Sequence, residues 1–315
     1  MLRRLSVTCL VLQLVAGSAR ATGEDEVPAL LSRLVRGSPG ESSRALDRLR
    51  YLGVAVTAPS LRVLLASPSA RERLAASSAY VVIHDPGATS LLEQVLTTDA
   101  DWEVRRNAVN ALAGLRARNA KRLIEHTLLH DPQERVRKSC ISALSTLGGA
   151  GAALAASSAT DTSLEVRLVA LDALAHSLDP SVGPRLRPLL QDPSALVRFA
   201  AARALSWTGD PAGRRYLEKA LASNDPEEVR HAATAISDVP KSWAVELLVH
   251  TLDGPDGEVA CNSAAALARR QDERGTRYLL KVASSAGPQA QQARTWLDRI
   301  GVVETLPQLP GGAAP

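Results

Sequence analysis

Residues 192–205 read DPSALVRFAAARAL, and this stretch decides the fold because close copies of it recur along the chain. The copy at residues 131–144 reads DPQERVRKSCISAL, and the copy at residues 161–174 reads DTSLEVRLVALDAL. Alignment on the central valine places the copies 30 to 32 residues apart, at Val104, Val136, Val166, Val197, Val229 and Val259. A period near thirty residues, with two helical segments in each period, predicts a helical solenoid.

The second helix of each repeat carries its apolar residues on one face. Counted from the valine, small or apolar residues recur four, seven, eight and eleven positions later, as at Ala108, Ala111, Leu112 and Leu115. This spacing is typical of one side of an α-helix. Aspartate–proline pairs precede several of these helices, where the aspartate can cap the free amides and the proline loses no hydrogen bond. We therefore expect stacked hairpins with the valines buried in the shared core.

One repeat departs from the pattern. Residues 148–160, GGAGAALAASSAT, contain three glycines and no charged residue. Glycine lowers helix propensity, so we expect a soft point with faster amide exchange than in the flanking repeats.

The two ends of the chain differ from the repeats. Residues 1–21 combine a basic start, an apolar stretch and Ala19-Arg20-Ala21, which together predict a secretory signal. Loss of Arg3, Arg4 and Arg20 with this signal lowers the formal net charge from +4 to +1. That small charge does not favour nucleic-acid binding. We expect a short linker over residues 22–27, the repeats over residues 28–302, and a disordered Pro/Gly-rich tail over residues 303–315.

The pattern D-P-x-x-x-V-R-x-x-A-x-x-A-L resembles the short HEAT-like repeats that are also found in phycobilin lyase subunits. The resemblance implies an all-α, right-handed α-solenoid (an α-α superhelix) of about eight to nine helical hairpins. It also implies a polar ladder between successive hairpins. Its members here would be Asp131, Asp161 and Asp192 with Arg137, Arg167 and Arg198.

Residues suited to catalysis or metal binding are few. His126 and His130 have the i, i+4 spacing at which two helical histidines can share a metal, but helix ends also favour histidine. Cys140 and Cys261 are expected to be free, buried thiols, and Cys9 belongs to the signal. The sequence has no glycine-rich phosphate loop and no serine or cysteine in a recognisable nucleophile turn. We therefore expect no catalytic residues, no metal site and no cofactor.

The stacked second helices of such a solenoid usually line its concave face, which is often a binding surface. Positions two and six residues after each valine should point away from the core. Leu168 and Phe199 are apolar at such positions, so they are predicted to be exposed anchors for a protein or peptide partner. The other expected partner-binding residues are charged or polar: Arg106, Lys138, Asp172, Arg203 and His231.

These features together predict an exported, non-enzymatic protein- or peptide-binding scaffold, periplasmic or extracellular, without stable membrane insertion after signal cleavage. Two alternatives remain open. One is a chaperone-like or lyase-type HEAT-repeat protein, and the other is a metal-dependent enzyme built on a HEAT scaffold.

Overall fold

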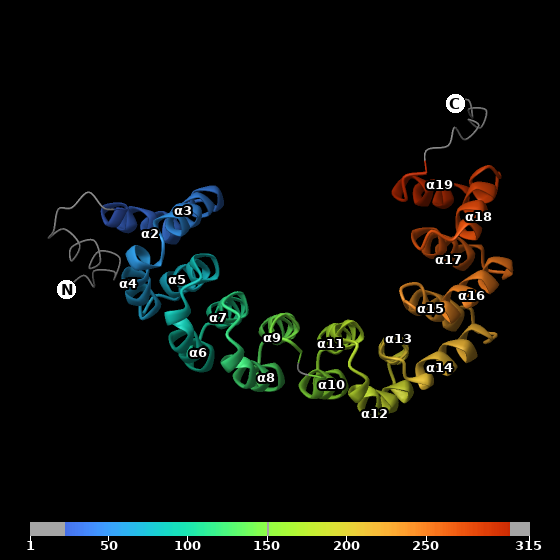
Figure 1. Cartoon of the computed structure of the whole chain (residues 1–315), viewed down its shortest axis with the longest axis horizontal. Helices are drawn as coiled ribbons and strands as arrows, with labels where there is room; N and C mark the ends of the chain where they lie inside the picture. Colours follow the sequence, from blue (N-terminus) through green and yellow to red (C-terminus); the bar gives the residue numbers. More distant parts are fainter. Residues whose placement is uncertain (1–22, 150, 303–315) are drawn as a thin grey trace, which may run out of the picture. The chain divides into compact units, whose positions relative to one another are not determined.

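A computed structural model of the chain describes residues 23–149 and 151–302. These residues contain 18 α-helices and several short 3-10 helices, and no strand is present in them. The α-helices pair in chain order into nine hairpins, from α2 with α3 to α18 with α19 (Figure 1). The prediction of an all-α solenoid is therefore confirmed, and the count of hairpins agrees with the eight to nine expected.

The expected signal (residues 1–21) and tail (residues 303–315) lie outside the described residues. The expected linker differs from the prediction, because Gly23–Glu26 form the 3-10 helix η1 and α2 already begins at Val27. Val27 is buried in the first hairpin, which explains the early start of the helix. Glu26 is held by Arg48, whose Nε and Nη2 donate to it at 2.8 and 2.7 Å.

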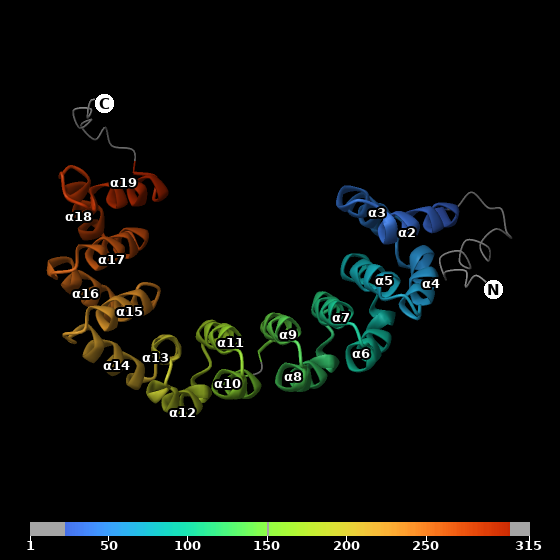
Figure 2. The ribbon, with the colours of Figure 1, turned by 180° about the vertical axis from the view of Figure 1, so that it is seen from behind.

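The chain divides into two compact units, residues 1–173 and residues 174–315. The helices of the first unit are α2 (Val27–Arg36), α3 (Pro39–Leu52), α4 (Val54–Leu65), α5 (Ala70–Ile83), α6 (Thr89–Thr98), α7 (Trp102–Gly114), α8 (Lys121–His130), α9 (Glu134–Thr146), α10 (Gly151–Thr160) and the start of α11 (Leu164–Ser177). Its second helices α3, α5, α7 and α9 contact one another in succession, and the first helices α4, α6 and α8 form a neighbouring row that packs against them (Figures 1 and 2).

The second unit repeats this arrangement. Its helices are the end of α11, α12 (Gly183–Leu186), α13 (Ala195–Thr208), α14 (Pro211–Leu221), α15 (Pro226–Ile236), α16 (Ser242–His250), α17 (Gly257–Arg269), α18 (Glu273–Ala283) and α19 (Ala290–Arg299). The second helices α13, α15, α17 and α19 contact one another in succession. In both units we call these rows the second-helix layer, and the rows of first helices the first-helix layer.

Five of the six recurring valines lie where the sequence predicted, whereas Val229 is only half-buried and lines a groove. Val104, Val136, Val166 and Val197 are 0% exposed, and Val259 is 4% exposed. A fully buried valine contributes about 1.5–3 kcal/mol relative to an exposed one, so this row is a large part of the core.

Two glycines mark the closest approaches between helices of the second unit. A Cβ on Gly213 of α14 would collide with the Ala202 carbonyl of α13, and one on Gly275 of α18 with the Ala264 carbonyl of α17. Because a larger residue would push the helices apart, glycine is required at both positions.

Several second helices end with a residue in the left-handed conformation. Gly209 has φ +87°. Four residues with a Cβ also have positive φ: His84 (+54°), Arg116 (+52°), Leu178 (+53°) and Gln271 (+63°). Residues with a Cβ are strained in this conformation, so four helix ends carry a local cost that glycine would avoid.

The glycine-rich repeat forms an ordinary helix at Gly151–Thr160, after Gly148 and Gly149 with φ of +100° and +73°. Its faster amide exchange stays a prediction.

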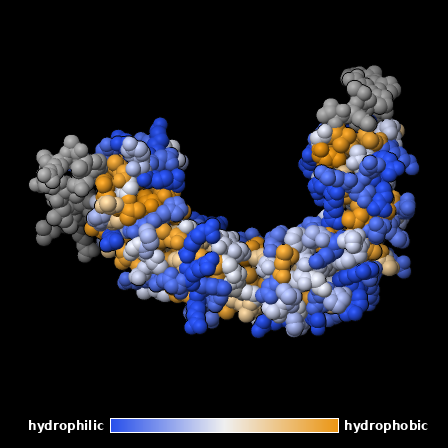
Figure 3. Space-filling view, in the orientation of Figure 1, coloured by the Kyte–Doolittle hydropathy of each residue, from blue (hydrophilic) through white to orange (hydrophobic). Residues whose placement is uncertain are grey.

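No helix in the described part of the chain is long and apolar enough to cross a membrane. Figure 3 shows polar and apolar residues mixed over the visible face, with apolar ones gathered over α19.

Candidate functional site

Three buried ion pairs join successive hairpins of the first unit. Arg73 binds Asp99, Arg105 binds Asp131, and Arg137 binds Asp161, each through Nε and Nη2 at 2.7 to 3.0 Å. The arginine side chains are only 10–17% exposed and the aspartates 4–5%. These pairs therefore lie well shielded from solvent, and we call them the ladder.

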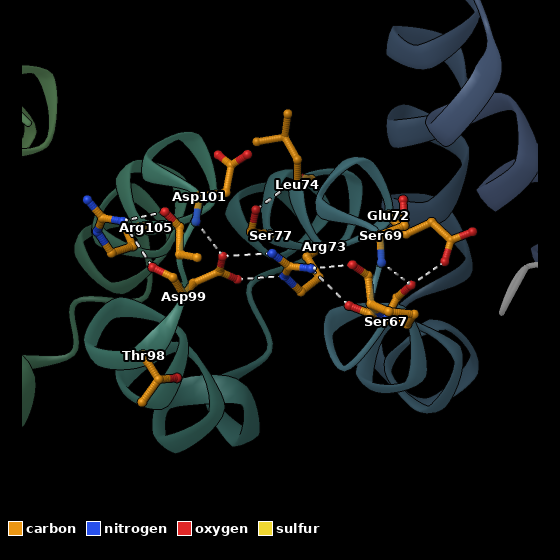
Figure 4. A network of polar contacts seen from close by, with 12 residues as sticks. Ser67, Ser69, Glu72, Arg73, Leu74, Ser77, Thr98, Asp99, Asp101 and Arg105 are labelled. Carbon is orange, nitrogen blue, oxygen red and sulfur yellow. Dashed lines mark hydrogen bonds and ion pairs between the residues drawn. The ribbon is translucent and has the colours of Figure 1, made fainter.

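Each ladder arginine also binds the backbone of its own hairpin. Arg73 Nη1 donates to the carbonyls of Ser67 and Pro68 at 3.0 and 3.1 Å, so the guanidinium fills the space between one loop and the next (Figure 4). Burial alone would raise the pKa of Asp99, but the Arg73 guanidinium and the Asp101 amide outweigh it and lower that pKa. Arg73 thus holds the Asp99 carboxyl in its charged form.

The later members of the expected ladder also bind the backbone of their loops. Arg167 Nε donates to the Ser158 carbonyl at 2.8 Å, and Asp192 accepts from the Ser194 amide at 2.9 Å. Arg198 Nε donates to the Tyr216 hydroxyl at 3.1 Å. At the 26-residue spacing of Arg73–Asp99 and Arg105–Asp131, the position after Arg198 is Asn224, and Asp225 lies one residue further on as the N-cap of α15. Two other pairs, Arg187–Asp210 and Arg230–Asp256, also join hairpins in this unit.

In the first unit, the expected partner-binding residues have varied environments. Lys138 Nζ lies 2.6 Å from Glu165 and 3.5 Å from Glu134, so its charge is already balanced. Leu168 is half-buried and Asp172 is exposed. Arg106 lies over the Trp102 ring. Leu168 belongs to the first unit and Phe199 to the second.

The prediction that Phe199 is an exposed anchor is wrong. Phe199 is 4% exposed and belongs to the core of the second unit. The Tyr216 ring meets it edge-on at 5.5 Å between centroids, and the His231 ring stacks on it at 5.3 Å. Side chains from α14 and α15 therefore cover a position that faces outward on an isolated helix. The neighbouring Arg203 donates to Asp238 at 2.7 Å and is held in place by that pair.

Sequence reasoning missed a cluster on the second-helix layer of the first unit. The guanidinium carbons of Arg106 and Arg135 each lie 5.3 Å from the centre of the Trp102 ring. Trp102 and Arg106 come from α7, whereas Arg135 comes from α9 of the next hairpin. The sequence pattern pointed to Arg106, but it did not place Trp102 or Arg135 beside it.

A second cluster of the same composition lies in the second unit. The guanidinium carbons of Arg269 and Arg299 are 5.5 and 5.1 Å from the Trp296 ring centre. Trp296 Nε1 also donates to Asn262 Oδ1 at 3.3 Å. We call the two groups, Trp102 with Arg106 and Arg135 and Trp296 with Arg269 and Arg299, the arginine–tryptophan clusters.

The second cluster borders a groove of about 280 Å³ between α15, α17 and α19. Its lining includes Arg230, Thr234, Asn262 and Ser263. Ser263 Oγ is buried and has no hydrogen-bond partner among the residues that the structure describes. A buried hydroxyl without a partner is costly, so this wall of the groove has unused hydrogen-bonding capacity.

A larger groove, of about 840 Å³, lies at the hairpin ends of α14 to α17. Arg230 borders it with a side chain that is 42% exposed, because its guanidinium turns to Glu227 and Asp256 instead of folding back on loop carbonyls. The shielding seen around the ladder arginines is therefore lost here.

The described histidine and cysteine side chains have well-defined surroundings. Within residues 23–149 and 151–302, no group of three or more His, Cys, Asp or Glu side chains could hold a metal ion. The His126 and His130 rings stack at 4.3 Å between centroids, and His130 Nδ1 lies 2.8 Å from the His126 carbonyl. Cys140 and Cys261 are free and buried, as predicted, and burial raises the pKa of both thiols. Neither thiol is therefore a ready nucleophile.

Comparison with known proteins agrees with this architecture. The family model described as HEAT repeats matches residues 89–175 and 152–238. No curated protein matches the chain. Importin beta is similar in structure, with a TM-score of 0.53 and 16% sequence identity, over 88% of this chain and 49% of its own. The chain thus spans about half the length of importin beta, and the likeness concerns the fold.

Two further solved structures are similar at lower TM-scores. The complex of CpcE and CpcF of phycocyanin lyase from Nostoc has a TM-score of 0.41 and 22% identity, over 78% of this chain and 94% of that one. Human deoxyhypusine hydroxylase has a TM-score of 0.34 and 22% identity, over 79% and 96%.

Proposed function

Because this chain is a HEAT-repeat protein, we propose that it is a non-enzymatic scaffold that binds a protein or peptide partner through its second-helix layer. The observation that carries the proposal is the groove between α15, α17 and α19, with its tryptophan, its arginines and an unpaired serine hydroxyl. A mixed lining of this kind suits a polypeptide, which offers backbone amides, carbonyls and side chains together.

The geometry of the repeats favours binding through contacts spread along one layer. The second helices of each unit contact one another in succession, so an extended partner can contact several hairpins in turn. The two thiols are buried with raised pKa values, and this supports a role without covalent catalysis. We propose no catalytic role for any residue of the chain.

We also propose that the protein acts in the periplasm or outside the cell. The support is the sequence of residues 1–21, which has the basic start, apolar stretch and small-residue cleavage site of a secretory signal. Expression of the full chain should give a protein that fractionates with the exported pool and begins near Thr22. A protein that keeps Met1 and stays in the cytoplasm would contradict export and leave the binding proposal to its own test.

The binding proposal is tested by affinity capture from an envelope extract with matched variants. Thr234→Trp places a bulky ring at an exposed position of the groove, and Lys219→Trp places the same ring at an exposed position of the first-helix layer. We expect a captured protein that Thr234→Trp loses and Lys219→Trp retains. The proposal is wrong if both variants capture the same proteins as the parent, or if nothing is captured specifically.

A further inference from the structure

The two arginines over Trp102 carry charge that the protein itself does not balance. No carboxylate among the described residues lies within 4.0 Å of the guanidinium of Arg106 or Arg135, and neither donates a hydrogen bond to another described residue. Glu134, beside Arg135 in the sequence, is already engaged by Lys138 at 3.5 Å. This contrasts with the ladder arginines, which are fully paired.

A guanidinium that stacks on an indole keeps its planar N–H edge free. The ring fixes the plane of the guanidinium and restricts its rotamers, and the N–H groups still point outward to an acceptor. A carboxylate matches that edge with two parallel hydrogen bonds, which are shorter and stronger than those between neutral groups. Each stacked arginine is therefore preorganised for a carboxylate that comes from outside the chain.

The same arrangement occurs independently in the second unit. Arg269 and Arg299 flank Trp296 and likewise have no ion pair within the described residues. Arg269 and Trp296 line the groove between α15, α17 and α19. Two of the four tryptophans thus hold a pair of unbalanced arginines, and in each case the cluster involves second helices from two hairpins.

We propose that the arginine–tryptophan clusters bind carboxylates of an acidic, extended polypeptide segment. This inference rests on the proposed function and adds the chemical class of the partner. A polypeptide fits better than a nucleic acid, because the formal charge without residues 1–21 is only +1 and the cationic sites are separate pairs. Acidic residues spaced along an extended chain would place carboxylates on such pairs without a continuous basic track.

The direct test is fluorescence polarisation of a labelled decaglutamate peptide, with decaglutamine as the uncharged control. The variants are Arg106→Gln with Arg135→Gln, and Arg269→Gln with Arg299→Gln. The matched control is Arg118→Gln with Arg122→Gln, which removes two exposed arginines from η3 (Arg118–Ala120) and α8. We expect saturable binding at both clusters, and each cluster variant should lose its own site and keep the other. The two variants combined should weaken binding about tenfold, and the control should change it by less than about twofold.

Two further arms separate specific stacking from general electrostatic attraction. Arg106→Lys with Arg135→Lys keeps both charges but loses the planar edge, so it should weaken binding nearly as much as the glutamine variant. Decaglutamate binding should disappear as the pH falls below about 4.3, where glutamate becomes neutral. A ten-residue oligothymidylate, which stays charged there, should bind more weakly than decaglutamate at neutral pH.

Several results would overturn the inference. The first is an absence of saturable decaglutamate binding, and the second is a control pair that weakens this binding as much as the cluster variants do. The others are unchanged decaglutamate binding by the lysine variant and tighter binding of the oligothymidylate than of decaglutamate. The test is separable from that of the proposed function. If Thr234→Trp abolishes capture while decaglutamate does not bind, the scaffold role stands and the acidic ligand class is wrong.

Discussion

Removal of a ladder arginine should destabilise the first unit far more than removal of an exposed one. Arg105→Ala deletes two hydrogen bonds to Asp131, at 2.8 and 3.0 Å, and two to the carbonyls of Asp99 and Ala100, at 3.0 and 3.1 Å. It also leaves the Asp131 carboxylate, whose side chain is 5% exposed, without its counter-ion. Loss of one partner from a buried pair costs about 3–5 kcal/mol.

We expect a loss of about 3 kcal/mol in the free energy of unfolding of this unit, at the lower end of that range. The reason is that Asp131 keeps one hydrogen bond, from the Gln133 amide at 2.9 Å. The matched control is Arg187→Ala, which breaks the pair with Asp210. Its arginine side chain is 55% exposed, so solvent screens the interaction and the loss should be about 0.5–1 kcal/mol.

The assay is urea denaturation followed by circular dichroism, with the transition of each unit fitted separately. Asp131→Asn in the Arg105→Ala background completes the comparison. It removes the uncompensated charge and keeps the hydrogen bond from Gln133, so the double variant should be more stable than Arg105→Ala alone. The reasoning is refuted if Arg105→Ala costs no more than Arg187→Ala, or if Asp131→Asn adds a further full loss.

Three other changes have distinct expected outcomes. Val197→Asp buries an unpaired charge and should cost more than about 4 kcal/mol by thermal melting, whereas Val63→Asp, at an exposed position, should cost less than about 0.5 kcal/mol. Arg116→Gly should stabilise the first unit by about 0.5–1 kcal/mol in urea, because φ is +52° there; a destabilised variant would contradict the strain argument. Asp99 has a pKa below its ordinary 3.8, so its contribution is complete above that value and lost as the pH falls through the lower folded pKa. Acid titration of unfolding should therefore show stability declining below about pH 4, less steeply in Asp99→Asn.

The architecture was predictable because its signals are local and repeated. The valine spacing and the small residues on the same helical face determine which side of each second helix is buried, and Val136, Val166 and Val197 are fully buried in the structure. A helix whose apolar residues keep one period has one way to bury them, so the sequence alone predicts the stacking.

The binding surface was less predictable because it depends on side chains from different hairpins. A helical projection places Phe199 outside the core, but it does not contain Tyr216 and His231, which cover it from neighbouring helices. Likewise Arg135 reaches Trp102 across the boundary between two repeats. Such contacts depend on the packing distance between helices and on the rotamer of a long side chain, and a single helical pattern specifies neither.

The hydrogen bond from Arg198 to the Tyr216 hydroxyl has a consequence for how the second unit responds to its surroundings. The hydroxyl acceptor forms a hydrogen bond and not an ion pair, so high salt does not deprive Arg198 of its acceptor. The ion pairs of Arg187 with Asp210 and of Arg230 with Asp256 have half-exposed arginine side chains, so high salt weakens them. At high salt, the ion pairs of Arg187 and Arg230 should therefore weaken on either side of α13 and α14, while the hydrogen bond from Arg198 to Tyr216 between these two helices persists.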